Sequence, residues 1–171
     1  MFAFTIYKFP IDPLNPLAFI YPLIIVSSFI VIFFADLKYG IIPDKVIVPT
    51  TFITTVYLLV FERLMFVSHM FSAFGAFLFF LIIFLFTKGR GMGFGDVKFA
   101  FLLGLILGFP GTPLALYVAF LTGGFVGIIL ILWKKKSLKL AVPFGPFLIV
   151  GALISFYFSQ NLIPKILPLF Y

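Results

Sequence analysis

Residues 91–98 read GMGFGDVK, and this short stretch decides how the rest of the chain is interpreted. Glycines occupy alternate positions before Asp96, and because glycine has no Cβ another backbone can approach it closely. Asp96 then opens the apolar run Val97–Phe109. A carboxylate at the mouth of a membrane segment is costly, so by default it marks function. The stretch therefore predicts that the rest of the chain brings a partner to Asp96.

The composition is that of a helical membrane protein. Of the 171 residues, 64% are hydrophobic and 10% are charged, whereas about 25% are charged in a typical soluble domain. Apolar stretches close to the roughly 20 residues needed to cross a bilayer recur along the chain. We therefore expect an all-α polytopic membrane protein, with residues 1–171 forming one membrane domain in the lipid bilayer. The sequence alone predicts no oligomeric state.

The net charge of +7 and the absence of cysteine exclude several functions. No basic face interleaved with aromatic residues is visible on a soluble module, so we expect no nucleic acid partner. A chain without cysteine has no disulfide, no thiolate zinc site and no cysteine nucleophile. We expect neither a metal nor a cofactor.

Six apolar segments predict six transmembrane helices, at about Leu17–Ala35, Val46–Phe61, His69–Phe86, Val97–Phe109, Leu114–Trp133 and Ala141–Ser159. The fourth has only about 13 residues, roughly 20 Å of helix, against a hydrocarbon core of roughly 30 Å. We expect it to begin inside the membrane, leaving Asp96 recessed; the alternative is a helix that extends back through the glycines. Residues 111–113 predict a tight turn. Small residues at 72–76, and Gly104 with Gly108, favour close helix packing.

The basic residues are distributed unevenly between the two sides that six spans define. The loops after the first, third and fifth spans hold nine, namely Lys38, Lys45, Lys88, Arg90, Lys98, Lys134, Lys135, Lys136 and Lys139. The opposite side holds three, namely Lys8, Arg63 and Lys165. Because positive loops stay in the cytoplasm, we expect both termini outside. Asp36, Asp44 and Asp96 then share the cytoplasmic side.

Asp36 and Asp96 are the strongest candidates for chemistry, because each lies at the cytoplasmic end of an apolar helix. Two carboxyl groups within hydrogen-bonding distance do not both ionise easily, so they share a proton. The ionised group can activate water while the protonated group polarises a peptide carbonyl. The residues alone leave two alternatives open: a proton or cation relay in a small transporter, or ion pairs with Lys38 and Lys98.

Three motifs add a resemblance to a known family. Residues 35–44 read ADLKYGIIPD, in which Asp36 is followed seven residues later by Pro43 and then by Asp44. Residues 93–98 read GFGDVK and match a GxGD motif, and residues 143–147 read PFGPF before the last span. In this order the motifs resemble the type IV prepilin peptidases, GxGD membrane aspartyl proteases that include the preflagellin peptidases. The resemblance covers nearly the whole chain.

The resemblance implies roles for individual residues. Asp36 and Asp96 would be the catalytic aspartates. The residues that would shape the site or contact the substrate are Pro43, Asp44, Gly93, Gly95 and Lys98. Pro43 would fix the loop that leaves Asp36, and the two glycines would shape the backbone beside Asp96. Lys98 would hold charge near the site, unless it serves only as a cytoplasmic anchor.

The resemblance also implies the reaction. The substrates would be prepilin or pseudopilin precursors, with a short basic leader before a hydrophobic helix, cut at the cytoplasmic face of the plasma membrane. Larger members carry an N-terminal CxxC region linked to N-methylation. This chain has no cysteine, so we expect cleavage without methylation, as in the short preflagellin peptidases. A protease of the presenilin kind is the runner-up, although its Pro-Ala-Leu element is missing. A transporter is less favoured, because no internal repeat is visible.

Overall fold

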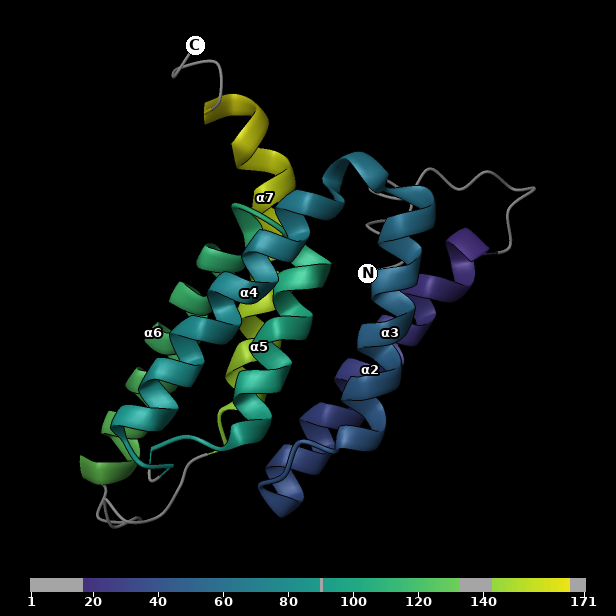
Figure 1. Ribbon diagram of the computed structural model, residues 1–171. Helices are drawn as coiled ribbons and strands as arrows, with labels where there is room; N and C mark the ends of the chain where they lie inside the picture. The colour runs from purple at the N-terminus through teal and green to yellow at the C-terminus, as the bar shows by residue number, and fades with distance from the viewer. Residues whose placement is uncertain (1–16, 90, 133–142, 167–171) are drawn as a thin grey trace.

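The computed structural model describes residues 17–89, 91–132 and 143–166. Six helices make up this part of the chain (Figure 1): α2 Leu17–Tyr39, α3 Asp44–Phe61, α4 Arg63–Phe86, α5 Phe94–Leu107, α6 Gly111–Leu132 and α7 Gly145–Ile166. The described residues contain no strand, so the predicted all-α fold with six helices is confirmed. The residues outside the described part are 1–16, Arg90, 133–142 and 167–171. The predicted span ends at Trp133 and Ala141 and the basic loop between them therefore lie outside the described residues.

Four of the described helices are long and apolar enough to cross a membrane: α2, α3, α4 and α6. The part of α7 whose side chains are described, Gly145–Phe158, is apolar, and α5 has 14 residues. Large apolar side chains are exposed on the outer surface, such as Phe52, Phe71 and Phe86. In water such a surface would drive association. These features identify a multi-pass membrane protein whose outer surface faces lipid.

Several helix boundaries differ from the predicted ones because helix ends in the membrane carry weak sequence signals. α2 continues four residues past Ala35, so Asp36 lies in its last turn rather than beyond it. Gly40 ends this helix with a φ of +64°, a left-handed conformation that glycine adopts without strain. α4 begins at Arg63, six residues before His69. α7, the last of the six helices, continues past the predicted end of the sixth span at Ser159 to Ile166.

The predicted turn at residues 111–113 is wrong, because these residues form the first turn of α6. Pro113 fits there, since the first turn of a helix needs no backbone N–H from its residues. Thr112 donates both its backbone N–H and its hydroxyl to the Gly108 carbonyl, at 2.8 Å each. The chain therefore passes from α5 to α6 through residues 108–110 alone.

α5 begins at Phe94, so Gly95 lies within the helix, whereas Gly91 and Gly93 precede it. Its 14 residues span roughly 21 Å, which leaves it too short to cross the membrane, as predicted. At its other end the buried His69 of α4 places Nδ1 2.6 Å from the Leu105 carbonyl oxygen. This contact satisfies one of the last carbonyls of the helix, which have no partner within it.

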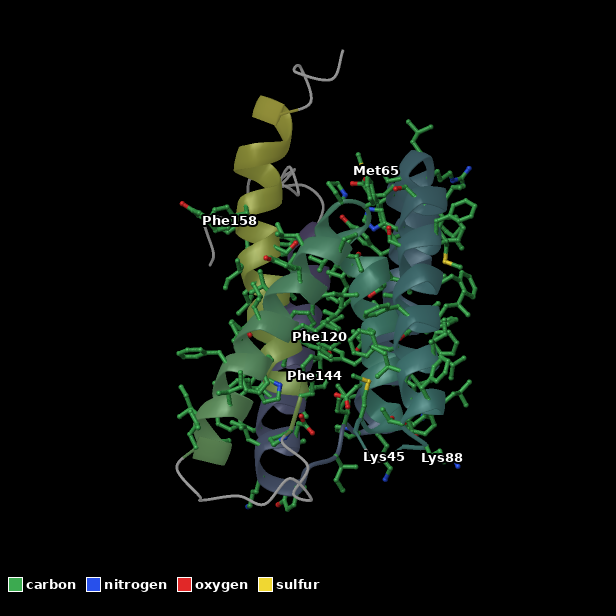
Figure 2. The ribbon with its side chains drawn as sticks, turned by 90° about the vertical axis from the view of Figure 1, so that its left-hand side faces the viewer. Lys45, Met65, Lys88, Phe120, Phe144 and Phe158 are labelled. Carbon is green, nitrogen blue, oxygen red and sulfur yellow. The ribbon has the colours of Figure 1, made fainter. Side chains whose placement is uncertain are left out.

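The helices alternate in direction, so three helices end and three begin at the lower end of the bundle in Figure 1. α2, α4 and α6 end there, whereas α3, α5 and α7 begin there. Figure 2 places Lys45 and Lys88 at this end and Met65 and Phe158 at the other. We call it the aspartate end, because Asp36, Asp44 and Asp96 all lie in helical turns that meet there.

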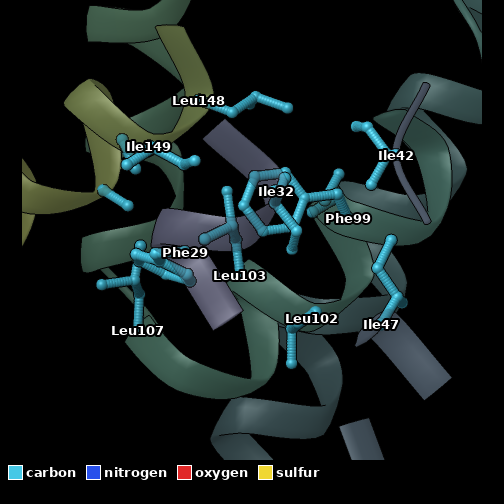
Figure 3. Close-up of a cluster of buried hydrophobic side chains, with 14 of the residues drawn as sticks. Phe29, Ile32, Ile42, Ile47, Phe99, Leu102, Leu103, Leu107, Leu148 and Ile149 are labelled. Carbon is cyan, nitrogen blue, oxygen red and sulfur yellow. The ribbon is translucent and has the colours of Figure 1, made fainter. Parts of the chain in front are cut away.

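α5 is the central helix of the bundle. It packs closely along α4 and also contacts α2, α3 and α7. Figure 3 shows Phe99, Leu102 and Leu103 of α5 among apolar side chains from α2, α3 and α7. A helix that is apolar on all sides is expected to be buried on all sides. Asp96 is therefore carried by the most enclosed helix of the protein.

Candidate active site

Asp36 lies in the last turn of α2 and is buried, with 4% of its surface exposed. Its Oδ2 accepts a hydrogen bond of 2.8 Å from the backbone N–H of Gly145, the first residue of α7. The contact joins residues 109 positions apart in the chain. The start of α7 is therefore the direct partner of the Asp36 carboxyl group.

Asp96 lies in the first turn of α5 and is buried, with 7% of its surface exposed. Its Oδ2 accepts a hydrogen bond of 3.1 Å from the Gly93 N–H, and its own N–H donates to the Gly93 carbonyl at 3.1 Å. Carboxylates near a helix N-terminus are stabilised by its free N–H groups. The other oxygen, Oδ1, is buried and has no hydrogen-bond partner. A buried polar atom without a partner is unusual in a folded protein.

The two carboxyl groups belong to one site. Asp36 is near enough for its charge to act on Asp96. Among the described residues, no cation pairs with either aspartate. Lys98 pairs with Asp44 instead, and Lys38 lies over the ring of Tyr39 at 5.1 Å. The alternative in which Lys38 and Lys98 neutralise the pair is therefore not supported. Two neighbouring carboxyl groups without a described counter-ion do not both ionise easily.

Asp44 is exposed and does not join the buried pair. Lys98 Nζ lies 2.7 Å from both carboxylate oxygens of Asp44, and it also lies 5.2 Å from the centre of the Phe94 ring. The side chains of Lys98 and Asp44 are 31% and 59% exposed. This exposed ion pair lies between the start of α3 and the first turns of α5.

The loop between α2 and α3 packs against the start of α5. Pro43 precedes α3, and its carbonyl accepts hydrogen bonds from Val46 and Ile47 at 3.0 and 3.2 Å. A Cβ on Gly95 would lie 3.0 Å from Cβ of Ile42. The absence of a side chain at Gly95 therefore lets this loop approach the helix that carries Asp96. Gly93 contributes the N–H that binds Asp96.

Gly145 is the residue at this site that was not predicted. The PFGPF motif at residues 143–147 indicated a family resemblance, but no role for a backbone N–H. Proline on either side of Phe144 and Gly145 is a signal that could have found it, because proline favours the first turn of a helix. A helix that begins at Gly145 presents free backbone N–H groups to the side chains in front of its first turn.

Removing the Asp44–Lys98 ion pair is expected to change stability little. Lys98→Met leaves Asp44 in water, and exposed ion pairs contribute about 0–1 kcal/mol. The coupling energy in a double-mutant cycle with Asp44→Asn, measured by thermal unfolding in detergent, is expected to stay below about 1 kcal/mol. A coupling of several kcal/mol would show that this pair holds α3 on α5.

The described residues contain no group of three or more His, Cys, Asp or Glu side chains that could bind a metal ion. The Asp36–Asp96 pair supplies only two carboxyl groups, and the sole histidine is bound to Leu105 in another part of the fold. The chemistry of the site must therefore be argued from these two carboxyl groups. The expected absence of a metal or cofactor stays a prediction.

The fold and the site together define a multi-pass helical membrane protein with a buried pair of aspartates at one end of its bundle. Comparison with known families agrees with this class. The sequence model of the type IV leader peptidase family matches residues 23–128. The chain belongs to the type IV leader peptidase family.

Curated relatives carry the name prepilin leader peptidase/N-methyltransferase. The protein of Legionella pneumophila is 30% identical over 151 residues, which cover 84% of this chain and 52% of that protein. The Aeromonas hydrophila protein is 36% identical over 78 residues, 46% of this chain and 27% of its own length. The Bacillus subtilis protein is 22% identical over 140 residues, which cover 82% of this chain and 56% of that protein. The chain thus spans about half or less of these relatives. No solved structure matches it.

Proposed function

We propose that this protein is a membrane aspartyl endopeptidase that removes the leader from prepilin or pseudopilin precursors. The observation that carries the proposal is the pair of buried carboxyl groups, Asp36 and Asp96, on two helices at one end of the bundle. Among residues 17–89, 91–132 and 143–166, no cation pairs with either of them. The names of the relatives supply the substrate class. Because the 171 residues contain no cysteine, we also propose that cleavage proceeds without N-methylation.

The proposed reaction needs one ionised and one protonated carboxyl group. The ionised group takes a proton from water as the water oxygen attacks the peptide carbonyl carbon. The protonated group donates a hydrogen bond to the carbonyl oxygen and stabilises the charge that develops there. The tetrahedral intermediate then collapses, its C–N bond breaks, and the leaving nitrogen takes up a proton. Asp96 Oδ1, which has no partner, is available for such a contact.

The proposed location is the plasma membrane, with the aspartate end in the cytoplasm. The nine-to-three distribution of basic residues supports this orientation, and both Lys45 and Lys88 lie at that end (Figure 2). Pro43, Asp44, Gly93, Gly95 and Lys98 lie at or next to the first turns of α3 and α5 and are proposed to shape the site. A basic leader held at this face would place its cleavage site next to Asp36 and Asp96.

The direct test is a cleavage assay with the purified protein in lipid bilayers. A prepilin is added, and the product is analysed by N-terminal sequencing and intact mass. We expect one cut after the leader and a product with an unmodified amino terminus. A methyl group on that terminus would contradict cleavage without methylation. Failure to cut any of a panel of prepilins and pseudopilins would contradict the peptidase proposal.

A further inference from the structure

The start of α7 is built around the Asp36 carboxyl group. α7 has 22 residues and begins at Gly145, whose N–H donates to Asp36 Oδ2 at 2.8 Å. The first N–H groups of a helix have no partner within it, and the helix dipole adds positive potential at that end. A carboxylate bound there is stabilised in its ionised form. Asp36 therefore has a partner that favours negative charge.

A side chain at this position of α7 would displace the Asp36 carboxyl group. A Cβ on residue 145 would lie 2.7 Å from Oδ2, 3.2 Å from Cγ and 3.4 Å from Cβ of Asp36. The nearest of these approaches is shorter than any that Cβ atoms normally make. Any other side chain would push Asp36 away from the start of the helix or displace the helix itself. The glycine thus provides both the donor and the room for the carboxylate.

Asp96 also lies at a helix N-terminus and accepts one backbone N–H, but its second carboxyl oxygen has a different environment. Its Oδ1 is buried with no hydrogen-bond partner, and a buried charged oxygen without a donor is strongly disfavoured. A proton on Oδ1 removes that cost and supplies a donor. The two aspartates therefore differ in their hydrogen bonding, because this buried oxygen of Asp96 has no donor.

In the part of the chain that the structure describes, the other charged groups around Asp36 do not reverse this asymmetry. From α5 it meets Asp96, which shares its site. From α3 the nearby carboxylate, Asp44, is engaged with Lys98. Residues 145–158 of α7 include no Asp, Glu, Lys, Arg or His. On its own helix, Lys38 is exposed and lies over Tyr39.

The geometry points to Gly145 as a positioning residue that fixes the roles of the two aspartates. The start of α7 holds Asp36 as the ionised carboxylate, the base of the reaction, and Asp96 carries the proton and acts as the acid. The roles in catalysis rest on the proposed function. The charge states themselves are a property of the protein without substrate, so they can be tested separately.

Infrared difference spectra of the protein in lipid bilayers at neutral pH test the charge states. Subtracting the spectrum of Asp36→Asn is expected to reveal carboxylate bands, and subtracting that of Asp96→Asn a carboxylic acid C=O band. Asparagine fits both sites, since its carbonyl oxygen can accept the same backbone N–H. The reverse assignment, or two carboxylates, would overturn the inference. These spectra need no substrate and no variant at residue 145.

Gly145→Ala tests the positioning itself, with Gly124→Ala as the matched control. Gly124 lies in α6 with no atom within 4 Å of an added Cβ. We expect Gly145→Ala alone to shift the Asp36 carboxylate bands, and an unchanged band would overturn the inference. In the cleavage assay, kcat is expected to fall about 10- to 100-fold while KM stays unchanged, as for the loss of one hydrogen bond to a charged group.

The two measurements separate this inference from the proposed function. If Gly145→Ala leaves kcat unchanged, or only raises KM, Gly145 is not a positioning residue, even where the wild type cleaves prepilin. If the wild type cleaves nothing but the spectra show an ionised Asp36 that responds to Gly145→Ala, the positioning stands and the peptidase proposal fails. If Gly145→Ala does not fold, the difference spectra with Asp36→Asn and Asp96→Asn still decide which aspartate is ionised.

Discussion

Replacing either Asp36 or Asp96 by asparagine is expected to abolish leader cleavage. Each substitution keeps the shape of the side chain and an acceptor for its backbone N–H, from Gly145 or Gly93. Each removes one proton-transfer group, and such a group contributes roughly 100- to 10,000-fold to a rate. The assay is conversion of precursor to mature product, followed over time with the protein in bilayers.

The control for this prediction is Glu62→Gln, which removes a carboxylate between α3 and α4, far from the aspartate end. It is expected to cleave at the wild-type rate. Both asparagine variants should also insert into the membrane and unfold close to the wild-type temperature. Full cleavage by Asp36→Asn and Asp96→Asn would remove both residues from the chemistry and contradict the proposed mechanism.

The meeting of Asp36 and Asp96 was predictable from the sequence, because it depends on topology. Counting spans and basic loops assigned both residues to one side of the membrane, so their helix ends are expected at the same end of the bundle. The partner of Asp36 was not predictable in the same way. The donor is the backbone N–H of Gly145, and every residue except proline has one. This N–H reaches the Asp36 carboxyl group because α7 begins at Gly145, and the sequence does not define that helix start.

Helix boundaries were less predictable than helix number for a related reason. In a soluble protein, polar caps mark helix ends, whereas here apolar residues continue through them. The predicted turn at residues 111–113 shows the ambiguity, since a proline after a glycine is typical both of a turn and of the first helical turn. The outcome depends on Gly108, which ends α5 with a φ of +63° and leaves only residues 108–110 for the connection.

Only some of the small residues that the sequence predicted at helix contacts make a close contact. Ala73 of α4 is fully buried, and Gly104 of α5 packs on it so closely that an added Cβ would collide with the Ala73 backbone and lie 2.8 Å from the Ser72 carbonyl carbon. Gly75 belongs to the same small-residue stretch but has no atom within 4 Å of an added Cβ. Composition therefore predicts that a close contact exists, and only the rotation of each helix about its axis decides which glycine makes it.

Gly104→Ala is accordingly expected to be strongly destabilising, whereas Gly75→Ala is not. α4 and α5 form one of the two most extensive helix contacts of the fold, and the obstructing atoms at Gly104 are backbone, which cannot rotate away as a side chain does. Overpacking of this kind costs about 1–3 kcal/mol or more, against the gain of about 1 kcal/mol that alanine brings to a helix interior.

For Gly104→Ala we expect a clearly lower midpoint of thermal unfolding in detergent and reduced prepilin cleavage, because displacing α5 also displaces Asp96. Gly75→Ala should keep the wild-type midpoint or raise it slightly. Equal midpoints for the two variants would contradict the packing of α5 on α4 at Ala73.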